Sequence, residues 1–226
     1  MAKLFLLRHI KSQWNKENRF AGWSDGPLDE DEFYEAKFLA DKIFKKFKID
    51  KIYCSRLFRN MDTVARMLEY GTDKYPMFLH LDGGRMQKWG SYLDGNEAAV
   101  PVLVSERLNE RYYGKLQGMN KEEAAKKYGE KTVHLWRRSY NVAPPKGESL
   151  RAVFKRVVPF YNQYIAKDLK NGKNVLVVAS HNSLRTIVKN IEKIPDSKII
   201  DLEIPYAGLF SYDFDQRLNI KTKIIL

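Results

Sequence analysis

Two stretches of the chain place a histidine after a run of apolar residues. Arg8 and His9 follow the run 4–7 directly, and His181 follows the run 175–179 after one serine. Short apolar runs of this kind predict buried strands, and in open α/β sheets ligands bind at the carboxyl ends of strands. An imidazole there can attack phosphorus, and the guanidinium beside it can hold two phosphate oxygens. The same pattern also marks strand ends without a catalytic role, so the rest of the chain must decide between the two interpretations.

The elements that would position these residues alternate between strands and helices. We expect strands at 3–7, 51–54, 175–179 and 208–214, with the last a candidate edge strand. We expect helices at 29–48, from 55 onward, at about 149–169 and at 183–193. The first of these helices has apolar residues at spacings of three and four, which gives it one buried face. A chain of 226 residues with this alternation predicts a single α/β domain over 1–226.

Charge and composition limit the class of protein. An apolar fraction of 44% is that of a folded globular chain. The formal net charge of +12 would attract any polyanion, nucleic acid included. The lysines are scattered over predicted helix faces, and no aromatic-and-basic nucleic-acid module can be recognised. A basic cleft for a small phosphorylated acid is compatible with the same charge, and we expect neither a nucleic-acid nor a membrane partner.

Cysteine use and hydropathy predict a cytoplasmic protein. Cys54 is the only cysteine, so no disulfide can form within the chain. No apolar run approaches the length needed to span a bilayer, and the first residues carry no signal-peptide pattern. We expect Cys54 to be a small core residue.

Nine stretches, in one order, carry a resemblance to a known family. They are Leu7-Arg8-His9, 12–20, Gly22-Trp23, 55–59, 108–114, 116–118, 126–129, 136–138 and 182–185. In these stretches the chain resembles the cofactor-dependent (2,3-bisphosphoglycerate-dependent) phosphoglycerate mutases of the histidine phosphatase superfamily. The resemblance covers most of residues 3–214. The stretches Glu-Arg-Tyr-Tyr-Gly and Trp-Arg-Arg point to the mutase branch more than to the phosphatases.

The resemblance implies a fold, an activity and a set of site residues. The fold would be a three-layer α/β/α sandwich with a mostly parallel sheet. The activity would be the interconversion of 3-phosphoglycerate and 2-phosphoglycerate through a phosphohistidine, with 2,3-bisphosphoglycerate as the priming cofactor and no metal. His9 would be the nucleophile and Glu110 the general acid and base, with Arg8, Arg59 and His181 around the transferred phosphoryl group. The implied substrate-binding positions are Asn15, Ala21, Gly22, Arg111, Tyr113, Lys121, Arg137, Arg138 and Asn182.

The chain departs from the family pattern at three places. Ile10 stands where the family has glycine after the nucleophile, and Lys11 where it has an acidic residue or glutamine. The family's second motif reads His-Gly-Asn-Ser-Leu-Arg, whereas this chain has Ser180-His181 before Asn182. Without a gap Ser180 takes the place of the catalytic histidine. We prefer a shift of one residue that keeps His181 there, because a phosphoryl site without its second imidazole loses a cation.

These departures keep two other functions open. The protein could be a histidine-type phosphatase for small phosphorylated substrates, or a catalytically impaired relative with a binding role. Residues 70–104 do not follow the family, and we expect an inserted loop or hairpin there, either a surface elaboration or a partner contact. A homodimer is compatible with the sequence.

Overall fold

A seven-stranded sheet forms the centre of the protein. The computed structural model describes residues 2–90 and 96–225. The strands are β1 (Ala2–Arg8), β2 (Lys51–Ser55), β3 (Tyr75–His80), β4 (Ala99–Ser105), β5 (Val175–Ala179), β6 (Leu209–Phe214) and β7 (Ile220–Ile225). Their order across the sheet is β3-β4-β2-β5-β1-β6-β7. The prediction of an α/β fold with a mostly parallel sheet is therefore confirmed.

The two central strands carry the histidine motifs. β1 and β5 pair in parallel, with Arg8 opposite Ala179, so both strands end at the same edge of the sheet. Strands β2, β3 and β4 run parallel to them. β6 is antiparallel to β1, and β7 is antiparallel to β6, so β7 again runs in the direction of β1. The sequence did not predict β3, β4 or β7. Strand β6, expected as a candidate edge strand, lies inside the sheet because β7 pairs with its outer side.

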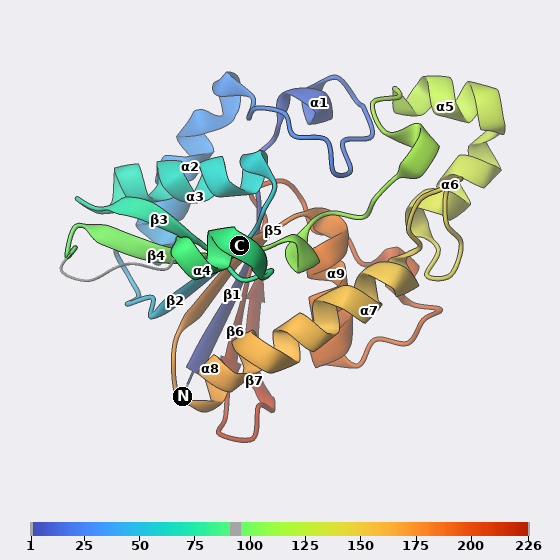
Figure 1. Cartoon of the computed structure of the whole chain (residues 1–226). Helices are drawn as coiled ribbons and strands as arrows, with labels where there is room; N and C mark the ends of the chain where they lie inside the picture. The colour runs from blue at the N-terminus through green and yellow to red at the C-terminus, as the bar shows by residue number, and fades with distance from the viewer. Residues whose placement is uncertain (1, 91–95, 226) are drawn as a thin grey trace.

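Helices cover both faces of the sheet, as the resemblance implied. On one face lie α2 (Phe33–Ile43) and α3 (Phe58–Gly71), and on the other α7 (Leu150–Phe160), α8 (Ala166–Lys170) and α9 (His181–Glu192) (Figure 1). A single π-helical turn, Tyr161–Ile165, joins α7 to α8. Alternate residues of β5 enter the two apolar cores, which is why this strand is apolar throughout.

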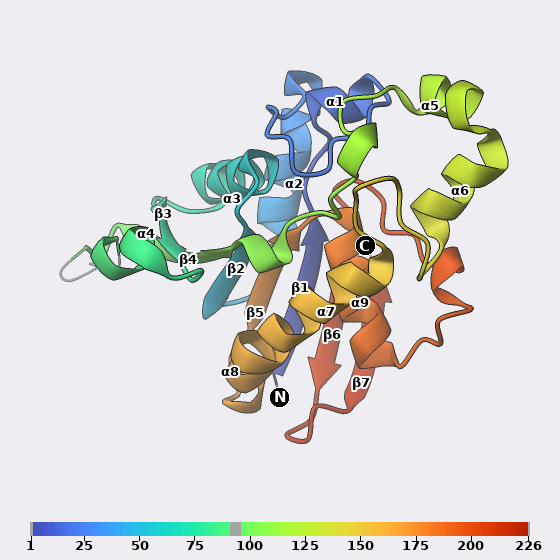
Figure 2. The same ribbon diagram turned by 45° about the vertical axis from the view of Figure 1, so that its right-hand side comes forward.

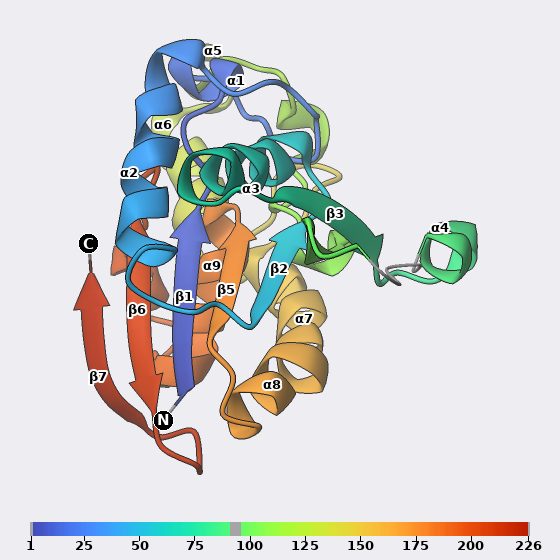
Figure 3. The same cartoon turned by 90° about the vertical axis from the view of Figure 1, so that its left-hand side faces the viewer.

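Short helices gather above the carboxyl ends of β1 and β5. They are α1 (Gln13–Lys16), α5 (Lys121–Tyr128) and α6 (Glu130–Arg138) (Figures 2 and 3). A third apolar cluster of Phe20, Leu116, Ala124 and Val133 joins this group. We call α5 and α6 the cover. The remaining turns are 3₁₀ segments at Glu30–Glu32, Glu106–Leu108, Gly114–Leu116 and Ile199–Asp201.

The segment 70–104 is not a hairpin. Strands β3 and β4 pair in parallel, from Tyr75 opposite Ala99 to His80 opposite Val104, and parallel neighbours need a crossover. The crossover contains the short helix α4 (Gly84–Trp89), which projects beyond the edge of the sheet (Figure 3). Part of the segment, 91–95, lies outside the described residues. No helix in the described part of the chain is long and apolar enough to cross a membrane.

Candidate active site

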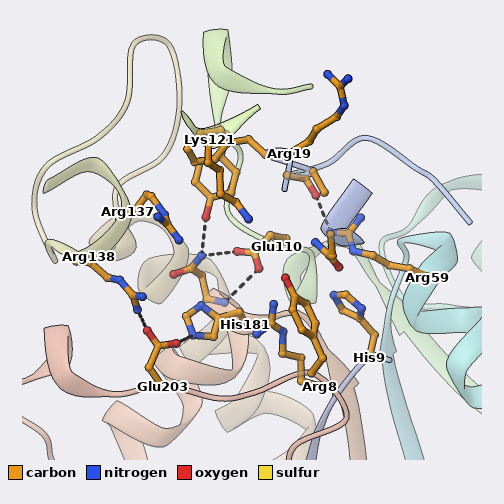
Figure 4. Close-up of a pocket in the computed structure, with 17 residues that line it drawn as sticks. Arg8, His9, Arg19, Arg59, Glu110, Lys121, Arg137, Arg138, His181 and Glu203 are labelled. Carbon is orange, nitrogen blue, oxygen red and sulfur yellow. Dashed lines mark hydrogen bonds and ion pairs between the residues drawn. The ribbon is translucent and has the colours of Figure 1, made fainter. Parts of the chain in front are cut away.

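A cavity of about 240 Å³ opens where β1 and β5 end, below the cover (Figure 4). Its lining is strongly basic, with six arginine or lysine side chains against two carboxylates. The lining residues are Arg8, His9, Asn15, Arg19, Phe20, Ala21, Gly22, Arg59, Glu110, Tyr113, Lys121, Arg137, Arg138, His181, Asn182, Glu203 and Tyr206. Segments from the whole length of the chain therefore meet around one strongly basic cavity.

His9 is buried just after β1. Its two ring nitrogens have different surroundings. Nδ1 lies 2.6 Å from the carbonyl oxygen of Ile10. Burial and the neighbouring Arg59 and Arg8 guanidinium groups lower the pKa of His9 well below its usual value of 6.5. The imidazole is therefore neutral at pH 7, and its one N–H must be on Nδ1, because only a protonated Nδ1 can donate to a carbonyl. The lone pair is left on Nε2, which is the state a nucleophile needs.

Ile10 takes part in this arrangement through its backbone. Its side chain is fully buried in the core between the sheet and α2 and α3. It is not among the residues with a positive φ. The backbone freedom that glycine would give is therefore not used at this position. Lys11 does not line the cavity, and its Nζ lies 3.3 Å from Oε1 of Glu32.

Two guanidinium groups flank His9. Arg8 donates to the carbonyl oxygen of Ile204 at 2.7 Å and stacks on the ring of Tyr206, 3.6 Å from its centroid. Arg59, at the start of α3, donates to the carbonyl oxygens of Gly22 and Ser24 at 2.8 and 3.0 Å. The Nε atoms of both arginines are buried and have no hydrogen-bond partner in the described part of the chain. Burial lowers the pKa of both groups, so a bound anion would restore interactions that these cations lack.

Glu110 is held between the two sides of the cavity by N–H donors. Its Oε1 accepts from the backbone of Arg111 at 2.6 Å and from the side chain of Asn182 at 2.7 Å. Asn182 is oriented in turn, because its Oδ1 accepts from Arg185 at 3.0 Å. The backbone carbonyl of Glu110 accepts from Arg156 at 2.8 Å. The carboxylate is therefore fixed both through its side chain and through its backbone.

His181 and Ser180 occupy different places at the start of α9. His181 lines the cavity, and its Nε2 lies 3.0 Å from Oε2 of Glu203. Burial, followed by the charge of Arg8 and other arginines, lowers the pKa of His181 well below 6.5. The Ser180 hydroxyl lies under the cavity, 3.4 Å from Nη2 of Arg59 and 3.1 Å from Nδ2 of Asn60. The structure therefore brings the imidazole of His181, and not the hydroxyl of Ser180, into the cavity lining.

The cover supplies the cations opposite His9. Lys121 begins α5, where Asn120 caps the helix, and Arg137 and Arg138 end α6. Burial lowers the pKa of Lys121 to about 8, with further contributions from Arg137 and Arg8. Arg111 was expected to bind substrate, but it does not line the cavity. It is fully buried behind Arg137, whose carbonyl oxygen accepts from its Nη2 at 2.7 Å.

The loop after β1 closes the remaining side. Oδ1 of Asn15 accepts from the backbone and hydroxyl of Ser12 at 3.2 and 2.8 Å, which leaves its Nδ2 as the donor for the cavity. Gly22 has φ +50°, and a Cβ there would lie 2.3 Å from the side-chain oxygen of Gln117. A side chain at position 22 would therefore be strained by this φ and would require the Gln117 side chain to shift. Ala21 lines the cavity without a polar side-chain group.

Thirteen of the fourteen predicted site residues line the cavity, and Arg111 is the exception. Four lining residues were not predicted: Arg19, Phe20, Glu203 and Tyr206. Arg19 and Phe20 belong to a stretch that matched the family, so position in that stretch was an available signal. Glu203 and Tyr206 lie between Ile199–Asp201 and β6, outside any motif. Within residues 2–90 and 96–225, no group of three or more His, Cys, Asp or Glu side chains could hold a metal ion.

Comparison with known proteins identifies the family. The model of the histidine phosphatase superfamily (branch 1) matches residues 4–81 and 92–223. The chain belongs to this superfamily. Within it, the chain is 42% identical over 218 residues to the 2,3-bisphosphoglycerate-dependent phosphoglycerate mutase of Methanococcus vannielii, covering 96% of this chain and 92% of that protein. The protein of that name from Protochlamydia amoebophila is 41% identical over 224 residues, covering 98% and 99%.

Solved structures support the fold. A mycobacterial glucosyl-3-phosphoglycerate phosphatase superposes with a TM-score of 0.76 over all of this chain and 97% of that chain, at 21% identity. Bacillus stearothermophilus YhfR superposes equally well, with a TM-score of 0.76 at 20% identity. The resemblance found from the sequence motifs is confirmed at the level of the superfamily and by the similarity to the mutases.

Proposed function

We propose that this protein interconverts 3-phosphoglycerate and 2-phosphoglycerate through a phosphohistidine at His9. One observation carries the proposal: a buried, neutral imidazole presents Nε2 to a cavity lined by six cations. The similarity to the mutases over nearly the whole chain selects this reaction among those of the superfamily.

The cavity fits the priming cofactor 2,3-bisphosphoglycerate. That molecule carries two phosphates and a carboxylate, and the cations form two groups that would receive separate anionic groups. Arg8 and Arg59 flank His9, whereas Lys121, Arg137 and Arg138 face them from the cover (Figure 4). The Nε atoms of Arg8 and Arg59 are buried and have no partner among the described residues, and we assign them as donors to the phosphate next to His9. When bound, the bisphosphate supplies the phosphoryl group that His9 receives.

The side chains have separate tasks in the proposed transfer. Nε2 of His9 forms a bond to phosphorus as the bond between phosphorus and the ester oxygen breaks. Glu110 delivers a proton to that oxygen, which would otherwise leave as a poor alkoxide, and it takes the proton back from the attacking hydroxyl in the return transfer. Arg8 and Arg59 stabilise the charge on the phosphoryl oxygens.

We assign the remaining residues to orientation of the substrate. Asn15 and the backbone at Ala21 and Gly22 would contact the phosphate or carboxylate from the loop after β1. Lys121, Arg137 and Arg138 would do so from the cover, Asn182 from α9, and Tyr113 from its position just before the 3₁₀ segment Gly114–Leu116. His181 is the second imidazole in this proposal. Its low pKa belongs to the ligand-free site, and a phosphate bound beside it would raise that pKa again.

We also propose a metabolic role and a cellular location for the protein. The substrate would be a small phosphorylated acid of glycolysis and gluconeogenesis, handled in the cytoplasm. The homodimer compatible with the sequence stays a prediction.

The experiment is a parallel measurement of isomerisation and of phosphate release. Conversion of 3-phosphoglycerate is followed with and without 2,3-bisphosphoglycerate, and free phosphate is measured in the same samples. We expect isomerisation that the bisphosphate stimulates, with little free phosphate. His9→Ala should abolish both activities and leave the circular dichroism spectrum unchanged. Phosphate release without isomerisation would make the protein a phosphatase, and undiminished turnover in His9→Ala would refute the nucleophile.

A further inference from the structure

A protein carboxylate occupies part of this anion site. Glu203 lies in the loop before β6, and its Oε2 is 3.0 Å from Nε2 of His181. Its Oε1 forms an ion pair with Nη1 of Arg138. Both partners line the cavity and both are assigned to the substrate under the proposed function. Glu203 therefore holds two groups that a bound anion would use.

Glu203 is the accessible member of this trio. Its side chain is 53% exposed, whereas those of His181 and Arg138 are 15% and 25% exposed. An exposed carboxylate can exchange a protein partner for water at low cost, because ion pairs at the surface contribute little to stability. His181 and Arg138 are less accessible to water, so an anion from a ligand is the better replacement when Glu203 leaves. The geometry thus allows a ligand to take the place of the Glu203 carboxylate.

Glu203 competes with a ligand mainly at the end of the cavity that is formed by the cover, and less at the end that contains His9. Glu203 pairs with Arg138 of the cover and lies on the opposite side from Arg59 and His9 (Figure 4). A single phosphate held next to His9 meets the charge of Glu203 only on the side of His181, and it does not need Arg138. A ligand that also carries a second phosphate places more negative charge at the cover, where Glu203 repels it and competes with it for Arg138.

We propose that Glu203 is a specificity-determining residue that weakens the binding of doubly phosphorylated ligands more than that of singly phosphorylated ones. This inference rests on the proposed function, since it concerns ligands that differ by one phosphate. In physical terms, Glu203 makes binding at the cover an exchange of one anion for another. The exchange limits how tightly the most highly charged ligand is held and so lets it leave or turn over within the site.

The test compares the affinities of two probes in proteins that cannot transfer phosphoryl groups. Glu203→Gln is combined with His9→Ala, and titration calorimetry measures the Kd of 2,3-bisphosphoglycerate and of inorganic phosphate. We expect the Kd of the bisphosphate to fall about tenfold and that of phosphate to fall less than threefold. Glu32→Gln is the matched control, because it removes the same charge from an ion pair with Lys11 outside the cavity. It should change neither Kd.

Two results would overturn the inference. Equal changes for the two probes would show that Glu203 does not discriminate between them. Weaker binding of both would show that Glu203 only bridges α6 and α9. Glu203→Ala is the second variant and should reproduce the selective tightening if charge is the cause. Isomerisation by the unmodified protein is measured separately, so a failure of the proposed function is distinguished from a failure of this inference.

Discussion

The low pKa of Lys121 predicts that the site loses affinity for anions as the pH rises above 8. Burial, Arg137 and Arg8 lower this pKa from 10.5 to about 8 in the ligand-free protein. Below pH 8 the ammonium group is present and attracts the ligand. Above pH 8 the amine is neutral, so binding an anion must also take up a proton.

The size of the effect follows from the linkage between protonation and binding. If the bound anion keeps Lys121 charged, the Kd scales with 1 + 10^(pH − 8). This factor is roughly 1.1 at pH 7 and roughly 11 at pH 9, so the affinity falls about tenfold, or about 1.4 kcal/mol. The fall continues by about tenfold per pH unit until the pKa of the bound form is reached.

Calorimetry with 2,3-bisphosphoglycerate at pH 7 and pH 9 measures this change, with the His9→Ala protein used to prevent turnover. Lys121→Arg in the same background is the control, because a guanidinium stays charged over this range. Titration of the ligand itself affects both proteins alike. Only the protein with Lys121 should lose an additional factor of about ten. The same pH dependence in both proteins would refute the reasoning, since Lys121 would then keep its proton.

Four substitutions test other parts of the site. Ile10→Gly should lower the free energy of unfolding by about 3–5 kcal/mol in chemical denaturation, because a fully buried side chain is lost, and a gain in turnover would contradict our account of Ile10. His181→Ala should lower kcat/KM by roughly 100-fold or more and Ser180→Ala by less than about tenfold; the reverse order would assign the catalytic role to Ser180. Arg156→Lys should lower kcat with little change in the Kd of phosphate, because Arg156 holds the backbone of Glu110; a weaker Kd with unchanged kcat would contradict this positioning role.

Two of the strands that the sequence predicted, β1 and β5, contain uninterrupted apolar runs. β5 is buried at every residue, and no other feature of the sequence competes with that pattern. β4 was missed because Pro101 interrupts it. Its pairing with β2 begins only at Val102, so the proline lies where one neighbouring strand is absent. β7 was missed because Lys221, Thr222 and Lys223 interrupt its isoleucines, and lysines are common in edge strands.

Some site residues could likewise be predicted from local motifs, whereas others reach the site only through the fold. His9, Glu110 and the cations of the cover lie in stretches that can be recognised one at a time. Glu203 and Tyr206 lie in the site only because the loop before β6 passes beside the cavity. No spacing within the sequence relates Glu203 to Arg138, 65 residues earlier by their numbers. Arg111 shows the opposite case, since its motif is recognisable but its side chain supports Arg137 from behind.

The departures at positions 10 and 180 have different physical consequences. Position 10 serves the site through a carbonyl oxygen that orients His9, and any residue with ordinary backbone angles can supply it. Ile10 therefore changes the core and leaves the nucleophile intact. Position 180 is different, because the junction between β5 and α9 has no spare residue. The carbonyl of Ser180 already accepts the helical hydrogen bond from Leu184 at 3.1 Å. The side chain of His181 therefore lines the cavity from the first turn of α9, where its Nε2 lies 3.0 Å from Glu203. The pairing with Glu203 thus accompanies the displaced histidine, and the two residues are best tested together.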